Sequence, residues 1–174
     1  MKISNSPWLL GGWLALAVGL SAQQPVPPPL PPESRQFDFW VGEWEVTTPD
    51  GKPAGSSRIE LIAGGAGLLE NWTGYPAPTG GSGKSLNAYN PGRKQWQQYW
   101  VGSGGGVLEL AGGLVGRDMV LTGEHTVSGQ GLTEKITWTP NADGSVRQHW
   151  EQSKDGGKTW TDAFDGLYRK KKPN

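Results

Sequence analysis

Turn signals recur about every ten residues along most of this chain, and this spacing is the feature that most constrains its fold. All contain glycine, and most combine it with proline, asparagine, aspartate or serine: Pro49-Asp50-Gly51, Ala63-Gly64-Gly65, Gly80-Gly81-Ser82-Gly83, Asn90-Pro91-Gly92, Gly104-Gly105-Gly106, Gly112-Gly113, Ser128-Gly129-Gln130-Gly131, Asp143-Gly144 and Asp155-Gly156-Gly157. The segments between them are rich in Trp, Val, Ile, Thr and Tyr, which favour strands. This pattern predicts strands near 43–48, 56–63, 67–73, 84–90, 95–102, 106–111, 117–125, 132–139, 145–153 and 159–169.

A long series of short antiparallel strands must close on itself or form two layers, because open edges invite aggregation. Links of hairpin length favour an up-and-down barrel over a Greek-key sandwich. We therefore expect an all-β antiparallel barrel of about 8–10 strands. No stretch between 43 and 169 keeps the 3.6-residue apolar period of a helix. A short helix is expected only at 34–41, at the N-terminal edge of the domain, where Ser34 can cap it and Phe37, Trp40 and Val41 share one face.

The first residues have the composition of a secretory signal. Lys2 precedes an apolar run at 8–20, which is too short to cross about 30 Å of hydrocarbon. Small residues at Ser21 and Ala22 offer a cleavage site. We expect residues 1–22 to be a signal peptide, the mature protein to be secreted or periplasmic, and no stable membrane insertion after cleavage. An uncleaved membrane anchor is the alternative.

The remaining chain reads as one domain behind a spacer. Residues 23–33 are dominated by proline, which favours extended polyproline II. The length suits a single domain, predicted at 34–170 and followed by a short tail at 171–174.

Composition excludes several classes of function. The chain has no cysteine, so disulfides, Cys-ligated metals and thiol nucleophiles are excluded. Its 16 basic and 16 acidic side chains balance, which argues against a nucleic-acid partner. No metal and no cofactor is predicted, because His125 and His149 are the only histidines and His149 falls on the strand face opposite the tryptophans. The oligomeric state cannot be inferred from the sequence.

The tryptophans gather on one predicted face of the strands. Because side chains alternate along a strand, Trp96, Gln98 and Trp100 share a face, and so do Gln148 and Trp150. If this face is interior, the predicted ligand-binding residues of the lumen are Glu70, Trp72, Trp96, Gln98, Trp100, Trp138, Gln148 and Trp150. Glu70 is the only acid that this assignment places there.

Flat aromatic walls with a few polar groups are what a small-ligand pocket requires. The leading hypothesis is therefore a non-catalytic binder of a small apolar or amphipathic molecule. Two alternatives remain open. The lumen could be the site of a lyase, isomerase or hydrolase around Glu70, or the protein could be a structural envelope module whose core is simply filled by side chains.

Gly42-Glu43-Trp44, at the start of the first predicted strand, resembles the G-x-W signature of lipocalins and other calycin barrels. In that family the indole closes the base of the barrel and an arginine from the last strand packs across it. The resemblance implies structural roles for Gly42, Trp44 and Arg169, with Arg169 stacked on Trp44.

A longer set of motifs resembles a family of uncharacterised bacterial exported proteins with a lipocalin-like barrel. The motifs are Phe37-Asp38-Phe39-Trp40-Val41-Gly42-Glu43-Trp44, Glu70-Asn71-Trp72, Gly83-Lys84-Ser85 with Asn87 and Tyr89, Trp96-x-Gln98-x-Trp100-Val101, Thr137-Trp138-Thr139-Pro140, Val146-Arg147-Gln148 and Phe164-Asp165-Gly166-x-Tyr168. The similarity spans residues 36–170. It implies a fold and no catalytic residue.

A final motif lies between the last two predicted strands. Ser153-Lys154-Asp155-Gly156-Gly157-Lys158-Thr159-Trp160 fits the S-x-D-x-G-x-T-W pattern of the Asp-box, which occurs in several copies in sialidase propellers. A single copy predicts a stabilised hairpin rather than catalysis, with structural roles for Ser153, Asp155, Gly157 and Trp160.

Overall fold

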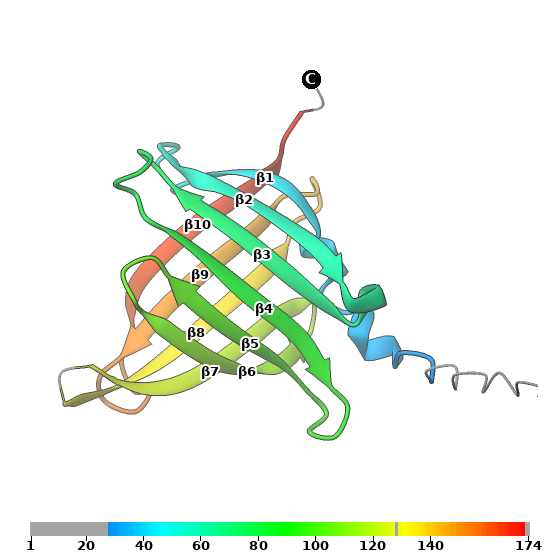
Figure 1. Cartoon of the computed structure of the whole chain (residues 1–174). Coiled ribbons are helices and arrows are strands. Elements are labelled where there is room, and N and C mark those ends of the chain that lie inside the picture. The colour runs from blue at the N-terminus through cyan, green and yellow to red at the C-terminus, as the bar shows by residue number, and fades with distance from the viewer. Residues whose placement is uncertain (1–27, 128, 173–174) are drawn as a thin grey trace, which may run out of the picture.

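The structure is a computed structural model that describes residues 28–127 and 129–172. These residues fold into a closed barrel of ten antiparallel strands in sequential order, each paired with the next and the last with the first (Figure 1). The strands are β1 (Gly42–Thr47), β2 (Pro53–Ile62), β3 (Gly67–Gly74), β4 (Ser82–Asn90), β5 (Gln95–Gly102), β6 (Val107–Val115), β7 (Asp118–Val127), β8 (Gln130–Pro140), β9 (Val146–Ser153) and β10 (Thr161–Lys170). The predicted all-β up-and-down barrel is confirmed, at the upper end of the expected strand count.

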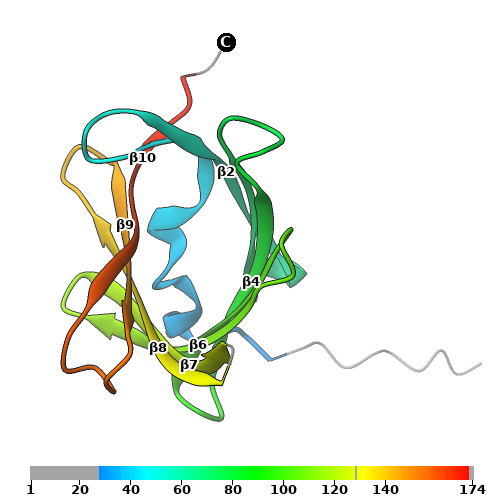
Figure 2. The ribbon, with the colours of Figure 1, turned by 90° about the vertical axis from the view of Figure 1, so that its left-hand side faces the viewer.

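The helix predicted at 34–41 is instead two short 3₁₀ helices, η1 (Pro32–Arg35) and η2 (Asp38–Trp40). Pro32 begins η1 because its fixed φ suits a first turn, and Ser34 lies inside that turn with no capping role. The two helices cross the lumen at one end of the barrel, as Figure 2 shows. A third, η3 (Ala63–Gly65), lies between β2 and β3.

Aromatic side chains fill the lumen at this closed end. Phe37 stacks on Trp40 with 5.0 Å between ring centroids and meets Trp96 and Trp138 edge-on at 5.6 and 5.1 Å. Trp44 lies beside them and donates a hydrogen bond from its Nε1 to the Trp40 carbonyl at 2.9 Å. All five side chains are buried, so this half of the lumen is a packed core.

The cation predicted to cover Trp44 is a different residue. Lys170, and not Arg169, places its Nζ 5.5 Å from the indole centroid. Lys170 lies directly opposite Trp44 in the β1–β10 pairing, whereas Arg169 pairs with Glu45 and is exposed on the outer wall. Alternation along the strand therefore excludes Arg169 from this role. Gly42 begins β1 at a φ of 147°, a conformation that favours glycine.

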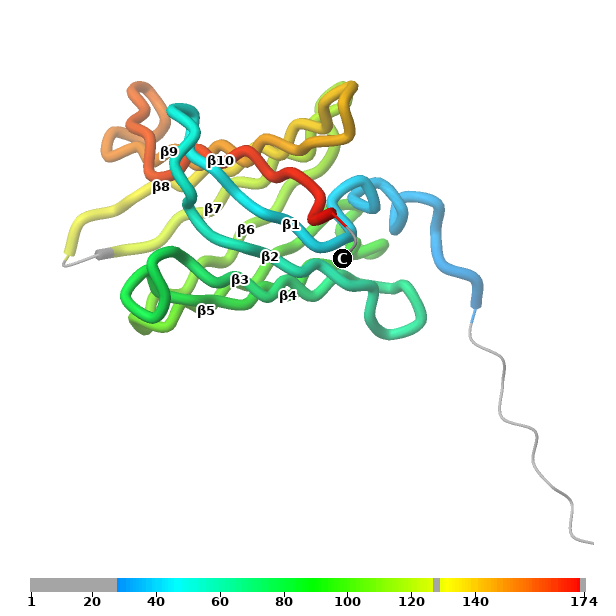
Figure 3. Tube along the Cα trace, turned by 90° about the horizontal axis from the view of Figure 1, so that it is seen from above, coloured from blue at the N-terminus to red at the C-terminus, as the bar shows by residue number. Residues whose placement is uncertain are grey.

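Both ends of the described barrel lie at the closed end. In Figure 3 the N-terminal segment and the end of β10 meet there, as an even number of antiparallel strands requires. The signal peptide predicted at 1–22 and the spacer residues 23–27 fall outside the described residues. Within the described part of the chain, no helix has the length and apolar character needed to cross a membrane.

Candidate functional site

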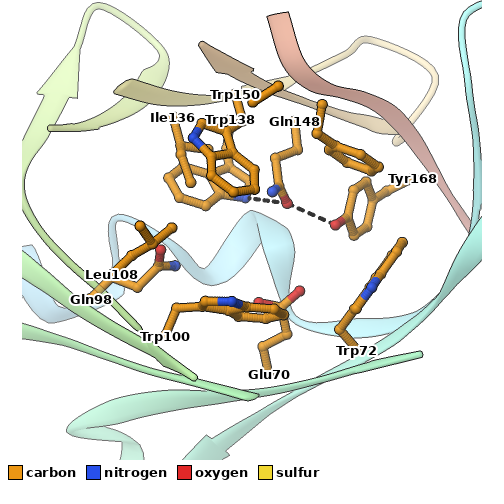
Figure 4. A pocket seen from close by; sticks show the side chains of 12 residues that line it. Glu70, Trp72, Gln98, Trp100, Leu108, Ile136, Trp138, Gln148, Trp150 and Tyr168 are labelled. Atoms are coloured by element: carbon orange, nitrogen blue, oxygen red, sulfur yellow. Dashed lines mark hydrogen bonds between the residues drawn. The ribbon is translucent and has the colours of Figure 1, made fainter. Parts of the chain in front are cut away.

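A cavity of about 160 Å³ occupies the lumen beyond the aromatic plug (Figure 4). Its lining residues are Glu70, Trp72, Gln98, Trp100, Leu108, Ile136, Trp138, Gln148, Trp150, Ala163, Phe164 and Tyr168. Seven of the eight predicted ligand-binding residues are among them. The eighth, Trp96, is buried in the closed end, where its Nε1 donates to Gln36 Oε1 at 3.2 Å.

The mouth of the cavity lies at the end opposite the plug. Trp72, Trp100 and Trp150 are only partly buried, whereas Trp138, deeper in the lumen, is 1% exposed. Ala163 lines the cavity and is itself exposed. The lumen is therefore filled by side chains at the closed end and open at the other end.

Inward-facing glycines explain why the tryptophans line the open half rather than fill it. A Cβ added to Gly83 would lie 2.1 Å from Cζ2 of Trp100. One added to Gly55 would lie 2.4 Å from the Thr73 carbonyl oxygen and 2.5 Å from Cη2 of Trp72. Each indole therefore lies against the bare backbone of a neighbouring strand. The rings can lie flat against the strands because glycine leaves no side chain beneath them.

Glu70 projects from β3 into this cavity and is held by neighbouring strands. Ser57 on β2 donates to Oε1 at 3.1 Å, and Ser85 on β4 donates to Oε2 at 3.0 Å. Asn87 donates to Ser85 Oγ at 2.9 Å, and Gln98 donates to Asn87 Oδ1 at 2.7 Å. A polar chain thus crosses β2 to β5 along one wall.

Burial raises the pKa of Glu70 from 4.5 to about 7, and the two serine hydroxyls partly oppose this rise. Glu70 as a whole is 4% exposed. It therefore exists as a mixture of acid and carboxylate near neutral pH.

Gln148 is the polar centre of the facing wall. Its Oε1 accepts hydrogen bonds from the Tyr168 hydroxyl at 2.7 Å and from Trp138 Nε1 at 3.1 Å (Figure 4). Burial and the nearby Glu70 charge raise the pKa of Tyr168 well above its usual value, so its hydroxyl stays protonated and donates. The hydrogen bonds of Gln148 among the described residues use Oε1, and none uses its side-chain amide nitrogen.

A second acid lies inside the barrel, contrary to the prediction that Glu70 is alone there. Glu134 on β8 is fully buried and accepts hydrogen bonds from Trp150 Nε1 at 2.5 Å and from Gln152 Nε2 at 3.0 Å. His125 Nδ1 lies 3.5 Å from its Oε1. Glu134 does not line the cavity; it fixes the indole of Trp150, which does. The alternation that assigned Ile136 and Trp138 to the lumen also assigns residue 134.

A β-bulge shapes the mouth. The register between β9 and β10 shifts between Asp162 and Phe164, which leaves Ala163 as the extra residue. Phe164 consequently faces inward and Asp162 faces outward, where its carboxylate lies 2.8 Å from His149 Nε2. His149 is thus on the outer wall, as predicted. Across the described ranges, no group of three or more His, Asp or Glu side chains could hold a metal ion.

The Asp-box motif forms a hydrogen-bonded turn between β9 and β10. Asp155 Oδ1 accepts from the backbone amides of Lys158 and Thr159 at 3.0 and 2.9 Å, and Ser153 Oγ accepts from the Gly157 amide at 2.8 Å. Trp160 closes the turn by donating to the Gly157 carbonyl at 3.1 Å. Gly157 has a φ of 86°, which favours glycine.

Comparison of the chain with protein-family models and with curated proteins finds no match to either.

Proposed function

We propose that this protein is a non-catalytic barrel that binds one small amphipathic molecule in the cavity between its indole walls. The observation that carries the proposal is the pairing of Trp72 with Gly55 and of Trp100 with Gly83, which keeps the rings flat and the space between them open. A side chain at either glycine would collide with the ring and displace it into the cavity.

The size of the cavity limits the ligand. An apolar protein cavity of about 150 Å³ accommodates benzene, so about 160 Å³ suits a molecule of roughly six to eight non-hydrogen atoms. A larger ligand would have to extend through the mouth. The indoles of Trp72, Trp100 and Trp150 contact its apolar body, and Glu70 and Gln148 orient its polar end.

Titration of the intrinsic fluorescence with a panel of small aromatic and amphipathic molecules tests this function. Binding should quench or shift tryptophan emission, because three indoles line the mouth. Ala163→Phe should obstruct the mouth and abolish the change. Ala111→Phe, on the outer wall of β6, is the matched control and should leave it intact. A response that survives Ala163→Phe, or a panel without any response, contradicts the proposal.

Catalysis is the second candidate, favoured by the pKa of about 7 at Glu70, which is near the optimum for a general base at neutral pH. Tyr168 on the opposite wall would supply a proton donor. Glu70→Gln separates the candidates, since turnover should disappear while binding of a neutral ligand survives. The structural-module alternative receives less support, because the lumen contains a cavity of about 160 Å³.

We further propose that the protein is exported and belongs among lipocalin-like barrels. The signal-like segment at 1–22 supports export to the periplasm or medium. Trp44 at the closed end supports the lipocalin likeness, whereas ten strands in place of eight, and Lys170 in place of an arginine, depart from it. Expression of the full chain in a bacterial host should give a mature protein whose mass corresponds to cleavage after Ala22; retention of the full mass would contradict export.

A further inference from the structure

The residues that line the cavity include an acidic group and no basic group. Among its lining residues Glu70 is the only acid, and none is a lysine, arginine or histidine. Basic residues next in sequence to lining residues are engaged on the outer wall: Lys135 pairs with Glu151 at 2.9 Å, and Arg147 pairs with Asp165 at 2.7 Å. The cavity therefore presents one carboxyl group without a counter-charge.

The surroundings of Glu70 are arranged for its ionised form. Ser57 and Ser85 each donate to a different carboxylate oxygen, which satisfies the charged group better than the acid. Burial nevertheless raises the pKa of Glu70, because a desolvated carboxylate without a cation is expensive. What this site lacks is positive charge.

The walls are also suited to a cation. Four indoles, Phe164 and the ring of Tyr168 surround the space, and the faces of aromatic rings carry negative potential that attracts ammonium groups. Figure 4 shows Trp100 beside Glu70 on one wall and Trp138 with Trp150 across the cavity from them. An anion would be repelled by Glu70, and a purely apolar molecule would leave Glu70 and the Gln148 amide unsatisfied.

We propose, building on the binding function above, that the ligand is a small organic cation, such as a methylated amine, held between the indole faces with Glu70 as its counter-ion. Choline has seven non-hydrogen atoms and matches the size limit. Its neutral analogue 3,3-dimethylbutan-1-ol has the same shape with carbon in place of nitrogen. The pair isolates the effect of charge.

Calorimetric or fluorescence titration of the full mature protein with the two probes tests the proposal. Cation–π contact and the Glu70 counter-charge both favour the charged probe, so choline should bind at least about tenfold more tightly than the alcohol at pH 8. Because the cation binds the carboxylate, its affinity should rise about tenfold between pH 6 and pH 8, following ionisation of a group with a pKa of about 7. The alcohol should show little pH dependence.

The groups that face Glu70 make this pH dependence interpretable. Ser57 on β2 and Ser85 on β4 do not titrate, and Tyr168 on β10 stays protonated. The pair of His125 and Glu134 lies behind Trp150 and does not line the cavity. Glu70→Gln should reduce the preference for choline over the alcohol and should abolish the rise in choline affinity between pH 6 and pH 8, because the variant has no carboxylate to ionise.

Each result has a distinct meaning. Equal or tighter binding of the alcohol, or choline affinity that does not change from pH 6 to pH 8, overturns the cation assignment and leaves the binding function standing. Failure of both probes and of every molecule in the wider panel overturns the binding function itself. The pH series uses the unmodified protein, so it stays decisive if Glu70→Gln does not fold.

Discussion

Replacing Glu70 by glutamine should change how stability depends on pH by an amount that follows from its burial. The folded protein holds the Glu70 proton more tightly than the unfolded chain, since its pKa rises from 4.5 to about 7. Protonated Glu70 therefore contributes stability that is fully present below about pH 4.5 and is lost as the pH rises through 7. Glutamine resembles the protonated acid in shape and never acquires the charge.

The size of the effect comes from the linkage between proton binding and folding. A rise of about 2.5 in pKa, at about 1.4 kcal/mol per pH unit, corresponds to about 3 kcal/mol. The free energy of unfolding of the wild type minus that of Glu70→Gln should thus fall by about 3 kcal/mol between pH 4 and pH 8. Groups common to both proteins cancel in this difference.

Urea unfolding followed by tryptophan fluorescence at several pH values measures the two free energies. Glu109→Gln, exposed on the outer face of β6, is the matched control and should stay within about 0.5 kcal/mol of the wild type throughout. A difference between the wild type and Glu70→Gln that is constant within about 0.5 kcal/mol from pH 4 to pH 8 would refute the argument. It would mean that water solvates Glu70 in the empty cavity.

Three further substitutions probe the walls, the plug and the hairpin. Gly83→Ala should destabilise the fold by about 1–3 kcal/mol in urea unfolding, because the new methyl group displaces the indole of Trp100. Phe37→Ala should lower the free energy of unfolding by about 3–5 kcal/mol, since it leaves a void in a fully buried aromatic cluster. Asp155→Ala should accelerate hydrogen exchange at the Thr159 amide, measured by NMR, because the carboxylate that accepts its hydrogen bond is removed.

Control substitutions test the physical reason behind each of these predictions. Gly113→Ala adds a methyl group that meets nothing within 4 Å, so a loss as large as that of Gly83→Ala would show that backbone freedom, and not the indole, is responsible. Leu30→Ala removes a side chain that is 44% exposed and should change stability little. If Phe37→Ala lowers the free energy of unfolding no more than Leu30→Ala does, the plug is not part of the cooperative core. Unchanged exchange at Thr159 would contradict the role given to Asp155.

The fold was predictable because its signals are local. Glycine-containing turns mark the ends of strands, and alternation assigns faces, so the ten strands and seven of the cavity residues follow from the sequence. Alternation does not give depth along the barrel, which is why Trp96 falls in the plug rather than the cavity. Which cation covers Trp44 depends on the exact pairing of β1 with β10, because a shift of one residue would exchange Lys170 for Arg169.

Other parts of the site depend on long-range contacts. The bulge at Ala163 has no signal in the sequence, yet it decides that Phe164 faces the lumen and Asp162 does not. The 3₁₀ geometry of the plug follows from packing against the barrel, which overrides the helical period of the segment. Glu134 is tolerated in the interior because Trp150 and Gln152 satisfy it, a pairing visible only in three dimensions.

The two ends of the described chain and the mouth of the cavity lie at opposite ends of the barrel. The described chain enters β1 and leaves β10 beside the plug (Figure 3), whereas the cavity opens at the opposite end of the barrel. A tag, a surface or a fusion partner at the N- or C-terminus should therefore leave access to the cavity unobstructed. The same polarity lets the loops of the mouth vary in length without disturbing how the protein is tethered.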